Sequence, residues 1–358
     1  MGLPKIDIQF RTLAASAVQR SQRGIVALVL KDETGTFDTR VYKGIEEIDE
    51  KEWSKQCLDY IKLAFKGIPS QIIVERVSTD SQIPLANPYS QALVRLKDKY
   101  WNWLSIPQLK DTEASDIATF IASQRMNRKK TFKAVLPNTA ADNEGIVNFT
   151  TDGIEANSMI YSTAEWCARL AGVFAGLPFT RSATYFVFPE VQAIHKSSEN
   201  PDADIEAGKL ILINDGKKVK IGRAVNSFVS FTPTKSQSFN KIAVVEVLDQ
   251  IRDDIRAVFE DHYVGKVKNS YINKLLFSTA INAYLETLEK DDALDPEAVN
   301  KVGIDIEQTR LYLKSIGQEV DDLPPEEIKR MNTDSHVFIG GSVKPLDAME
   351  DLRFLITL

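Results

Sequence analysis

The feature that most restricts the fold of this chain is the alternation of short apolar runs with amphipathic segments over residues 24–136. The run 24–30 is apolar at every position after its glycine, which is typical of a strand that is covered on both faces of a sheet. The pattern predicts strands at 24–30, 37–42, 71–77, 103–106 and 131–136, with helices at 49–66, 89–101 and 112–128. Such alternation predicts βαβ units, and therefore an α/β fold with a mainly parallel sheet flanked by helices.

The second half of the chain predicts a smaller domain of α+β type. A hairpin is expected around Asp215-Gly216, since Asp-Gly supplies the positive φ angles of a tight turn. Gly340-Gly341 is expected to break the chain between two strands, 336–339 and 350–358. The remaining predicted elements are a strand at 146–150 and helices at 163–175, 239–263, 271–288 and 306–315.

Both ends of the chain alternate apolar and polar residues with the period of two that is typical of a strand. The apolar positions are Ile6, Ile8 and Phe10 near the start, and Leu352, Phe354, Ile356 and Leu358 at the end. A terminal strand either docks at an edge of its own sheet or completes a sheet in a neighbouring copy. We therefore expect an N-terminal arm at 1–23, an α/β domain at 24–200, a C-terminal domain at 201–345 and a C-terminal strand arm at 346–358.

Composition excludes several classes of protein. With 358 residues, 43% of them hydrophobic, the chain has ample material for a core, and its net charge of −6 argues against nucleic-acid binding. The stretch 286–327 is strongly acidic, and a solvated face explains it adequately. Cys57 and Cys167 lie in helical patterns without disulfide or metal spacing, so we expect both to be buried. No apolar run suits a membrane span or a conventional export signal, so we expect synthesis in the cytosol and no insertion into membranes.

Reactive constellations are missing from the sequence. His195, His262 and His336 lie far apart without ligand spacing, and no phosphate-binding glycine loop, dinucleotide fingerprint or nucleophile elbow occurs. The sequence therefore predicts a protein that is not an enzyme, with no catalytic residue, no cofactor and no metal. An α/β enzyme whose site is assembled from distant residues remains an alternative.

Several spaced blocks resemble the tail sheath proteins of contractile phage tails, most closely the sheaths of phage-tail-like bacteriocins of R type. The chain is similar to a short form of this family, without its additional outer domains. The blocks are 2–10, 20–26, 222–227, 239–242, 262–269 and 343–350.

The resemblance implies a structural subunit that polymerises with itself as six-membered rings, stacked helically around an inner tail tube. Contraction of the sheath drives the tube through a target cell envelope. The two terminal arms add strands to sheets of neighbouring subunits, which is β-augmentation in an arrangement that does not close. Ala14, Ala15 and Ser16 would form the hinge of the N-terminal arm. The receiving sheet is expected near 220–232 and 336–344, in the domain that the resemblance identifies as the inner sheath domain.

The same resemblance implies further partners: the tube protein, and baseplate and terminator proteins, in a virion or a released tail-like particle made in bacterial cytoplasm. Lys266 and Lys268 are candidates for the tube contact; the alternative is a capping turn with lysines near a helix C-terminus. Two questions stay open at the level of the sequence: whether the protein is a non-contractile homo-oligomeric scaffold, and whether the C-terminal strand completes the chain's own domain.

Overall fold

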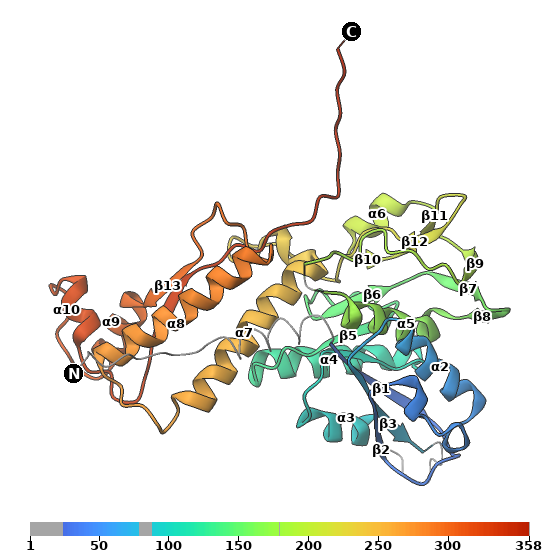
Figure 1. Ribbon diagram of the computed structural model, residues 1–358, viewed down its shortest axis with the longest axis horizontal. Helices are drawn as coiled ribbons and strands as arrows, with labels where there is room; N and C mark the ends of the chain where they lie inside the picture. Colours follow the sequence, from blue (N-terminus) through green and yellow to red (C-terminus); the bar gives the residue numbers. More distant parts are fainter. Residues whose placement is uncertain (1–23, 79–87, 179, 358) are drawn as a thin grey trace, which may run out of the picture. The chain divides into compact units, whose positions relative to one another are not determined.

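The structure is a computed structural model that describes residues 24–78, 88–178 and 180–357 (Figure 1). Its contacts divide these residues into two compact units. The first, here the sheet unit, contains residues 24–246 and 348–357, and the second, the helical unit, contains residues 247–347. Helix α7 (Ile242–His262) begins in the sheet unit and ends in the helical unit.

A seven-stranded sheet organises the sheet unit, in the order β10-β6-β5-β4-β1-β3-β2. Every neighbouring pair is parallel except β2 with β3, which is antiparallel. The mainly parallel sheet predicted from the sequence is therefore confirmed. Its strands are β1 (Ile25–Lys31), β2 (Thr39–Tyr42), β3 (Gln71–Val77), β4 (Trp103–Ser105), β5 (Lys133–Pro137), β6 (Ile146–Phe149) and β10 (Lys209–Leu210).

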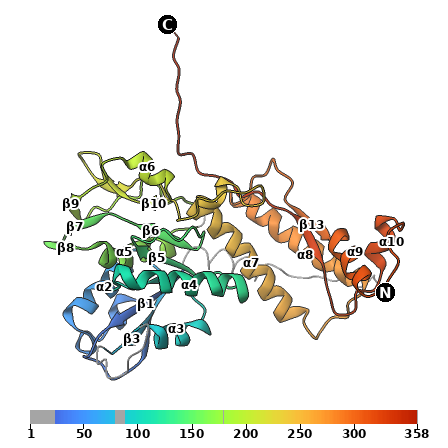
Figure 2. The ribbon, with the colours of Figure 1, turned by 180° about the vertical axis from the view of Figure 1, so that it is seen from behind.

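Helices cover both faces of this sheet (Figures 1 and 2). One face packs on α2 (Lys55–Phe65) and α5 (Thr163–Gly176), and the other packs on α3 (Ser90–Lys97) and α4 (Asp111–Asn127). Residues 26–30 of β1 are fully buried, as expected for a strand at the centre of two apolar layers. The helices predicted in this half are confirmed, although α2 begins six residues later than the predicted helix 49–66, after a short 3₁₀ helix at Glu50–Glu52.

Two smaller sheets complete the sheet unit. An antiparallel sheet in the order β8-β7-β9 packs over α5, and β11 with β12 forms the hairpin expected at Asp215-Gly216. Because β10 joins the large sheet, residues 201–246 share a unit with the α/β core, whereas the sequence predicted a boundary after residue 200. These elements are β7 (Asp152–Ala156), β8 (Met159–Tyr161), β9 (Val191–Lys196), α6 (Pro201–Glu206), β11 (Leu212–Asn214) and β12 (Val219–Ile221).

The helical unit is built on the end of α7 and on α8 (Tyr271–Lys290), which were both predicted. Aromatic rings join the two helices, with 5.3 Å between the centroids of Phe259 and Phe277. Strand β13 (Lys301–Ile304) lies along α8 and pairs antiparallel with β14 (Ile339–Ser342) (Figure 1). The predicted helix at 306–315 is confirmed as α9 (Ile306–Ser315), and α10 (Pro325–Arg330) packs against it.

Two predictions about the end of the chain need correction. Gly340 and Gly341 do not break the chain between strands, because both lie inside β14 and pair with β13. Residues 351–357 have no assigned strand, although the chain there runs extended (Figures 1 and 2). Within the described ranges, none of the helices combines the length and the apolar character that a membrane crossing needs.

Candidate functional site: the C-terminal arm and its anchor

Parallel α/β sheets bind ligands where successive crossovers diverge, here at the carboxyl ends of β1 and β4. In this protein, the chain's own side chains occupy that position. Gln108 accepts a hydrogen bond from the Lys31 N–H at 2.7 Å and donates one to the Lys31 carbonyl at 3.0 Å. Asp32, only 3% exposed, accepts hydrogen bonds from the Ser54 N–H at 2.9 Å and the Ser54 hydroxyl at 2.6 Å. These polar groups hold the ends of the strands together.

The electrostatics of this position are those of a structural site. Burial alone raises the pKa of Asp32, but hydrogen bonds from Ser54 and Thr34 outweigh it and hold this pKa below its usual value. Burial raises the pKa of the neighbouring Cys57 thiol to about 12. A thiol that stays protonated at neutral pH is a poor nucleophile. Both cysteines are buried, as the sequence predicted.

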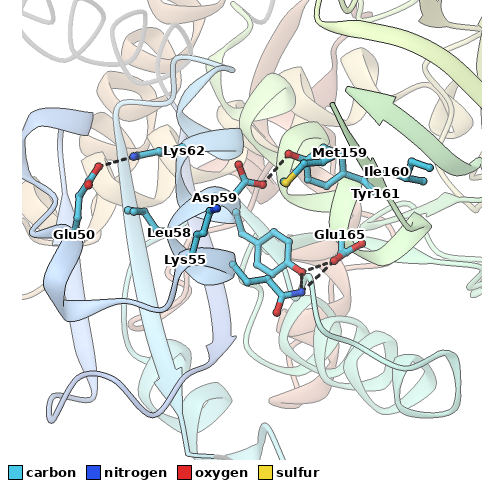
Figure 3. Close-up of a pocket in the computed structure, with 11 residues that line it drawn as sticks. Glu50, Lys55, Leu58, Asp59, Lys62, Met159, Ile160, Tyr161 and Glu165 are labelled. Carbon is cyan, nitrogen blue, oxygen red and sulfur yellow. Dashed lines mark hydrogen bonds and ion pairs between the residues drawn. The ribbon is translucent and has the colours of Figure 1, made fainter. Parts of the chain in front are cut away.

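A cavity of about 680 Å³ opens between α2 and β8 (Figure 3). The Tyr60 hydroxyl donates a hydrogen bond to Glu165 at 2.5 Å, and the Tyr161 hydroxyl donates one to Asp59 at 2.8 Å. Burial and these carboxylates raise the pKa of both tyrosines. The titratable groups are thus tied to one another, and neither tyrosine is poised to exchange a proton near neutral pH.

Metal-binding clusters are likewise lacking in the part of the chain that the structure describes: no group of three or more His, Cys, Asp or Glu side chains is arranged to hold an ion. His195 instead lies 3.1 Å from Glu155 on the exposed edge of the small sheet.

The most unusual surface lies at the end of the chain, in the segment 351–357, here called the C-terminal arm. Leu352, Phe354 and Ile356 are 90%, 77% and 67% exposed, and Leu355 is 83% exposed. Single exposed apolar residues are ordinary, but a run of this kind marks an interaction site. The backbone of the arm forms no hydrogen bond to the rest of the described chain. Leu358, the last predicted strand residue, lies outside the described residues.

The arm has a fixed root at Glu350, whose side chain is only 9% exposed. Its carboxylate accepts hydrogen bonds from the hydroxyls of Ser182 at 3.0 Å and Thr184 at 2.6 Å. Arg223 lies 3.5 Å from the same carboxylate and donates to Asp351 at 2.5 Å, which raises the pKa of Arg223. The chain is therefore held at residues 350 and 351, and everything beyond projects from that point.

Sequence reasoning missed this anchor. Arg223 and Glu350 both lie in blocks that carried the family resemblance, but nothing in one sequence showed that the blocks meet. Ser182 and Thr184 had no signal at all, because each is a common polar residue outside any recognisable motif.

The two regions that were expected to receive a donated strand differ in whether a strand edge is free to pair. Residues 220 and 221 in β12 pair with β11 on one side and with residues 185–187 on the other. That position is occupied by the chain itself. The second region, 336–344, contains β14, which among the described strands pairs with β13 alone.

Lys266 and Lys268 lie in the turn between α7 and α8. The Lys266 ammonium donates to the carbonyl of Asp261 in the last turn of α7, and Gly265 adopts a positive φ of 72°. Lys266 thus caps a helix C-terminus, as the capping explanation requires. Lys268 lines a cavity of about 500 Å³ beside the rings of Tyr263 and Phe277. A contact between either lysine and a tube stays a prediction.

The remaining predicted site residues lie outside the described residues. They are the strand positions Ile6, Ile8 and Phe10 and the hinge positions Ala14, Ala15 and Ser16.

The chain's own side chains fill the crevice at the ends of β1 and β4, and the exposed apolar arm beyond Glu350 is typical of a surface that binds another protein chain. Comparison with known proteins gives the family. Residues 85–227 match the family model described as "Phage tail sheath protein central domain", and residues 234–358 match "Phage tail sheath C-terminal domain". The tail sheath protein of Clostridium phage phiCD119 is 34% identical, over 100% of this chain and 99% of that protein.

Solved structures share the fold. The sheath tail protein Lin1278 from Listeria innocua superposes with a TM-score of 0.74 at 17% identity, over 97% of each chain. The helical sheath of the anti-feeding prophage in its contracted state gives a TM-score of 0.68 at 12% identity, over 100% of this chain and 99% of that one. The chain belongs to the phage tail sheath protein family, as the sequence resemblance indicated.

Proposed function

We propose that this protein is the sheath subunit of a contractile tail, with no enzymatic activity. It polymerises as stacked six-membered rings around an inner tube, and contraction drives the tube through a target envelope. The observation that carries the proposal is the C-terminal arm, whose apolar side chains are exposed beyond an anchored root. A strand with unpaired backbone and an apolar face gains most by joining a sheet elsewhere.

The N-terminal segment is proposed to act in the same way. Ile6, Ile8 and Phe10 alternate as the arm residues do, and Ala14, Ala15 and Ser16 supply a short hinge of small residues. Each subunit then donates strands to its neighbours, so subunit bodies rotate and move outward while the main-chain hydrogen bonds between them persist. An extended sheath that is metastable stores the energy for contraction, and the barrier that holds it is kinetic.

Partners follow from the same proposal. The anti-feeding prophage structures that share this fold include a helical sheath and a baseplate, so we infer self-assembly and baseplate association for this chain. A tube protein, contacted through Lys266 or Lys268, and a terminator protein complete the set. The subunit is made in the bacterial cytoplasm and functions in a virion or a released tail-like particle.

Electron microscopy of the purified protein tests this proposal. Negatively stained samples should show long hollow cylinders with six-fold end views. Monomers or discrete rings at every protein concentration would contradict a sheath.

Deletion of residues 1–20 tests the role of the N-terminal arm on its own. The truncated chain should fold and stay soluble, and it should no longer form cylinders. Replacement of Ile8 by Asp should act alike, because it places an unpaired charge on the buried face of the donated strand. Normal cylinders from either variant would show that the N-terminal arm does not link subunits.

A further inference from the structure

The cavity of about 500 Å³ in the helical unit, beside the turn that joins α7 to α8, has both aromatic and polar lining residues. Its aromatic side is formed by three rings, with 5.3 Å between the centroids of Phe259 and Phe277 and 4.6 Å between those of Tyr263 and Phe277. Sites for small ligands typically enclose about 300–1,000 Å³ and combine apolar walls with a few polar groups. The size and the lining of this cavity therefore suit a small organic ligand.

Lys274, in the first turn of α8, places a buried positive charge in the lining of this cavity. The residue is only 4% exposed, and its ammonium donates a hydrogen bond to the Thr333 hydroxyl at 2.8 Å. Among the described residues, no carboxylate forms an ion pair with this ammonium, although it has three N–H groups to donate. Burial lowers the pKa of Lys274, and no neighbouring acid offsets that change. Because a buried charge is costly unless it is paired, this ammonium is suited to an added anion.

Asn269 brings an acceptor oxygen to the same place. Its amide nitrogen donates to the Thr333 hydroxyl at 3.1 Å and to the carbonyls of Asp334 and His336 at 2.8 and 2.9 Å. Since carbonyls only accept hydrogen bonds, these two contacts fix the orientation of the amide. Asn269 Oδ1 is buried and has no hydrogen-bond partner in the described chain. The amide of Asn269 and the ammonium of Lys274 bond the same hydroxyl, so a cation and an unused acceptor lie close together.

We propose that this cavity binds a small monocarboxylic acid that carries a hydroxyl group and an apolar body. The ligand carboxylate accepts hydrogen bonds from the Lys274 ammonium, and the ligand hydroxyl donates one to Asn269 Oδ1. The apolar body contacts the three aromatic rings. Hydrogen bonds between charged groups are about twice as strong as neutral ones, so the carboxylate contributes most of the selectivity. This ligand site is independent of the strand exchange proposed above.

The charge of the lining favours an anion with a single negative charge. The lining residues include two lysines, Lys268 and Lys274, and one aspartate, Asp334, so their net charge is +1. The Asp334 carboxylate accepts a hydrogen bond from the Tyr312 hydroxyl at 2.8 Å. A phosphate dianion would bring a second negative charge near this carboxylate, and like charges at close range disfavour each other. A monocarboxylate matches the net charge of the lining.

Calorimetric titration of the full chain with mandelate tests the proposal. Mandelate carries a carboxylate, an adjacent hydroxyl and a phenyl ring, and mandelamide has the same shape without the charge. Mandelate should bind with a dissociation constant on the order of 1 mM, and mandelamide should bind at least about tenfold more weakly. Mandelate should also raise the melting temperature, because it binds the folded chain. Equal binding of the two compounds, or no binding of mandelate, would overturn the proposal.

A pair of matched substitutions on α8 tests the role of the buried ammonium. Lys274→Met should weaken mandelate binding at least about tenfold, and its melting temperature without ligand should stay equal or rise, because an unpaired buried charge is removed. Lys290→Met makes the same change at an exposed position outside the cavity and should alter the affinity less than about twofold. Unchanged affinity in Lys274→Met would contradict the proposed site. If that variant does not fold, the comparison of mandelate with mandelamide in the unaltered chain decides the question.

Discussion

Leu355 and Ile356 provide an internal comparison of the two faces of the arm. The two residues are isomers, they are adjacent, and both are exposed, by 83% and 67%. If the arm is donated as a strand, Ile356 lies on the face shared with Leu352 and Phe354, which is buried against the neighbour. Ile356→Ala should therefore weaken assembly much more than Leu355→Ala.

The magnitude follows from the atoms removed. Either substitution deletes three carbons, and burial of a methylene contributes about 0.8 kcal/mol, so Ile356→Ala should cost about 2 kcal/mol per subunit contact. At about 1.4 kcal/mol per tenfold, the critical concentration for polymerisation should rise about 30-fold. The unassembled subunit should keep its free energy of unfolding within about 0.5 kcal/mol, because the deleted atoms already contact solvent.

Sedimentation over a range of protein concentrations at fixed ionic strength measures the critical concentration, and thermal melting of the monomer controls for folding. Equal shifts for Ile356→Ala and Leu355→Ala would refute the face assignment. An effect of less than about twofold for both would refute burial of the arm in a neighbour.

Three further substitutions probe the supporting structure. Asn282→Ala removes the side chain that accepts a hydrogen bond from the Val302 N–H, so it should lower the free energy of unfolding by about 1–3 kcal/mol in denaturant titrations. As a control, Thr279→Ala at an exposed position of the same helix should change the free energy of unfolding little. Glu350→Gln should raise the rate of hydrogen exchange around the arm root, because it removes the charge that two hydroxyls and a guanidinium face. An unchanged exchange rate would show that the Glu350 carboxylate does not hold the arm root. The Asp32 carboxylate, whose pKa is lowered on folding, stabilises the protein above its unfolded value of 3.8, and this stability is lost as the pH falls through the lower folded value. Asp32→Asn should accordingly make the melting temperature less sensitive to pH in that acid range, and an identical pH profile would contradict the assignment.

The central sheet was predictable because its signals are local. The buried run 24–30 and the helices that alternate with the next strands depend on periods of two and 3.6, which one sequence displays directly. The alternation of apolar and polar residues in the arm was visible for the same reason, although no strand is assigned there.

Other features depend on contacts between distant residues. The grouping of Ser182, Thr184 and Arg223 around Glu350 joins parts of the chain that no periodicity relates. Gly340 and Gly341 were misjudged because glycine usually interrupts a strand, whereas here both pair within β14 and the backbone of β13 approaches Gly341 too closely for a side chain. The two units also differ from the predicted domains, because β10 pairs with β6 of the large sheet. That pairing joins residues distant in the sequence, so it is visible only in the tertiary fold.

A helical reconstruction of the assembled protein by electron cryomicroscopy tests the central claim most directly. The account predicts continuous density from Glu350 into a strand that completes a sheet of a different subunit. Density that returns the arm to its own subunit, or leaves the arm of every subunit unpaired within an intact cylinder, would contradict it.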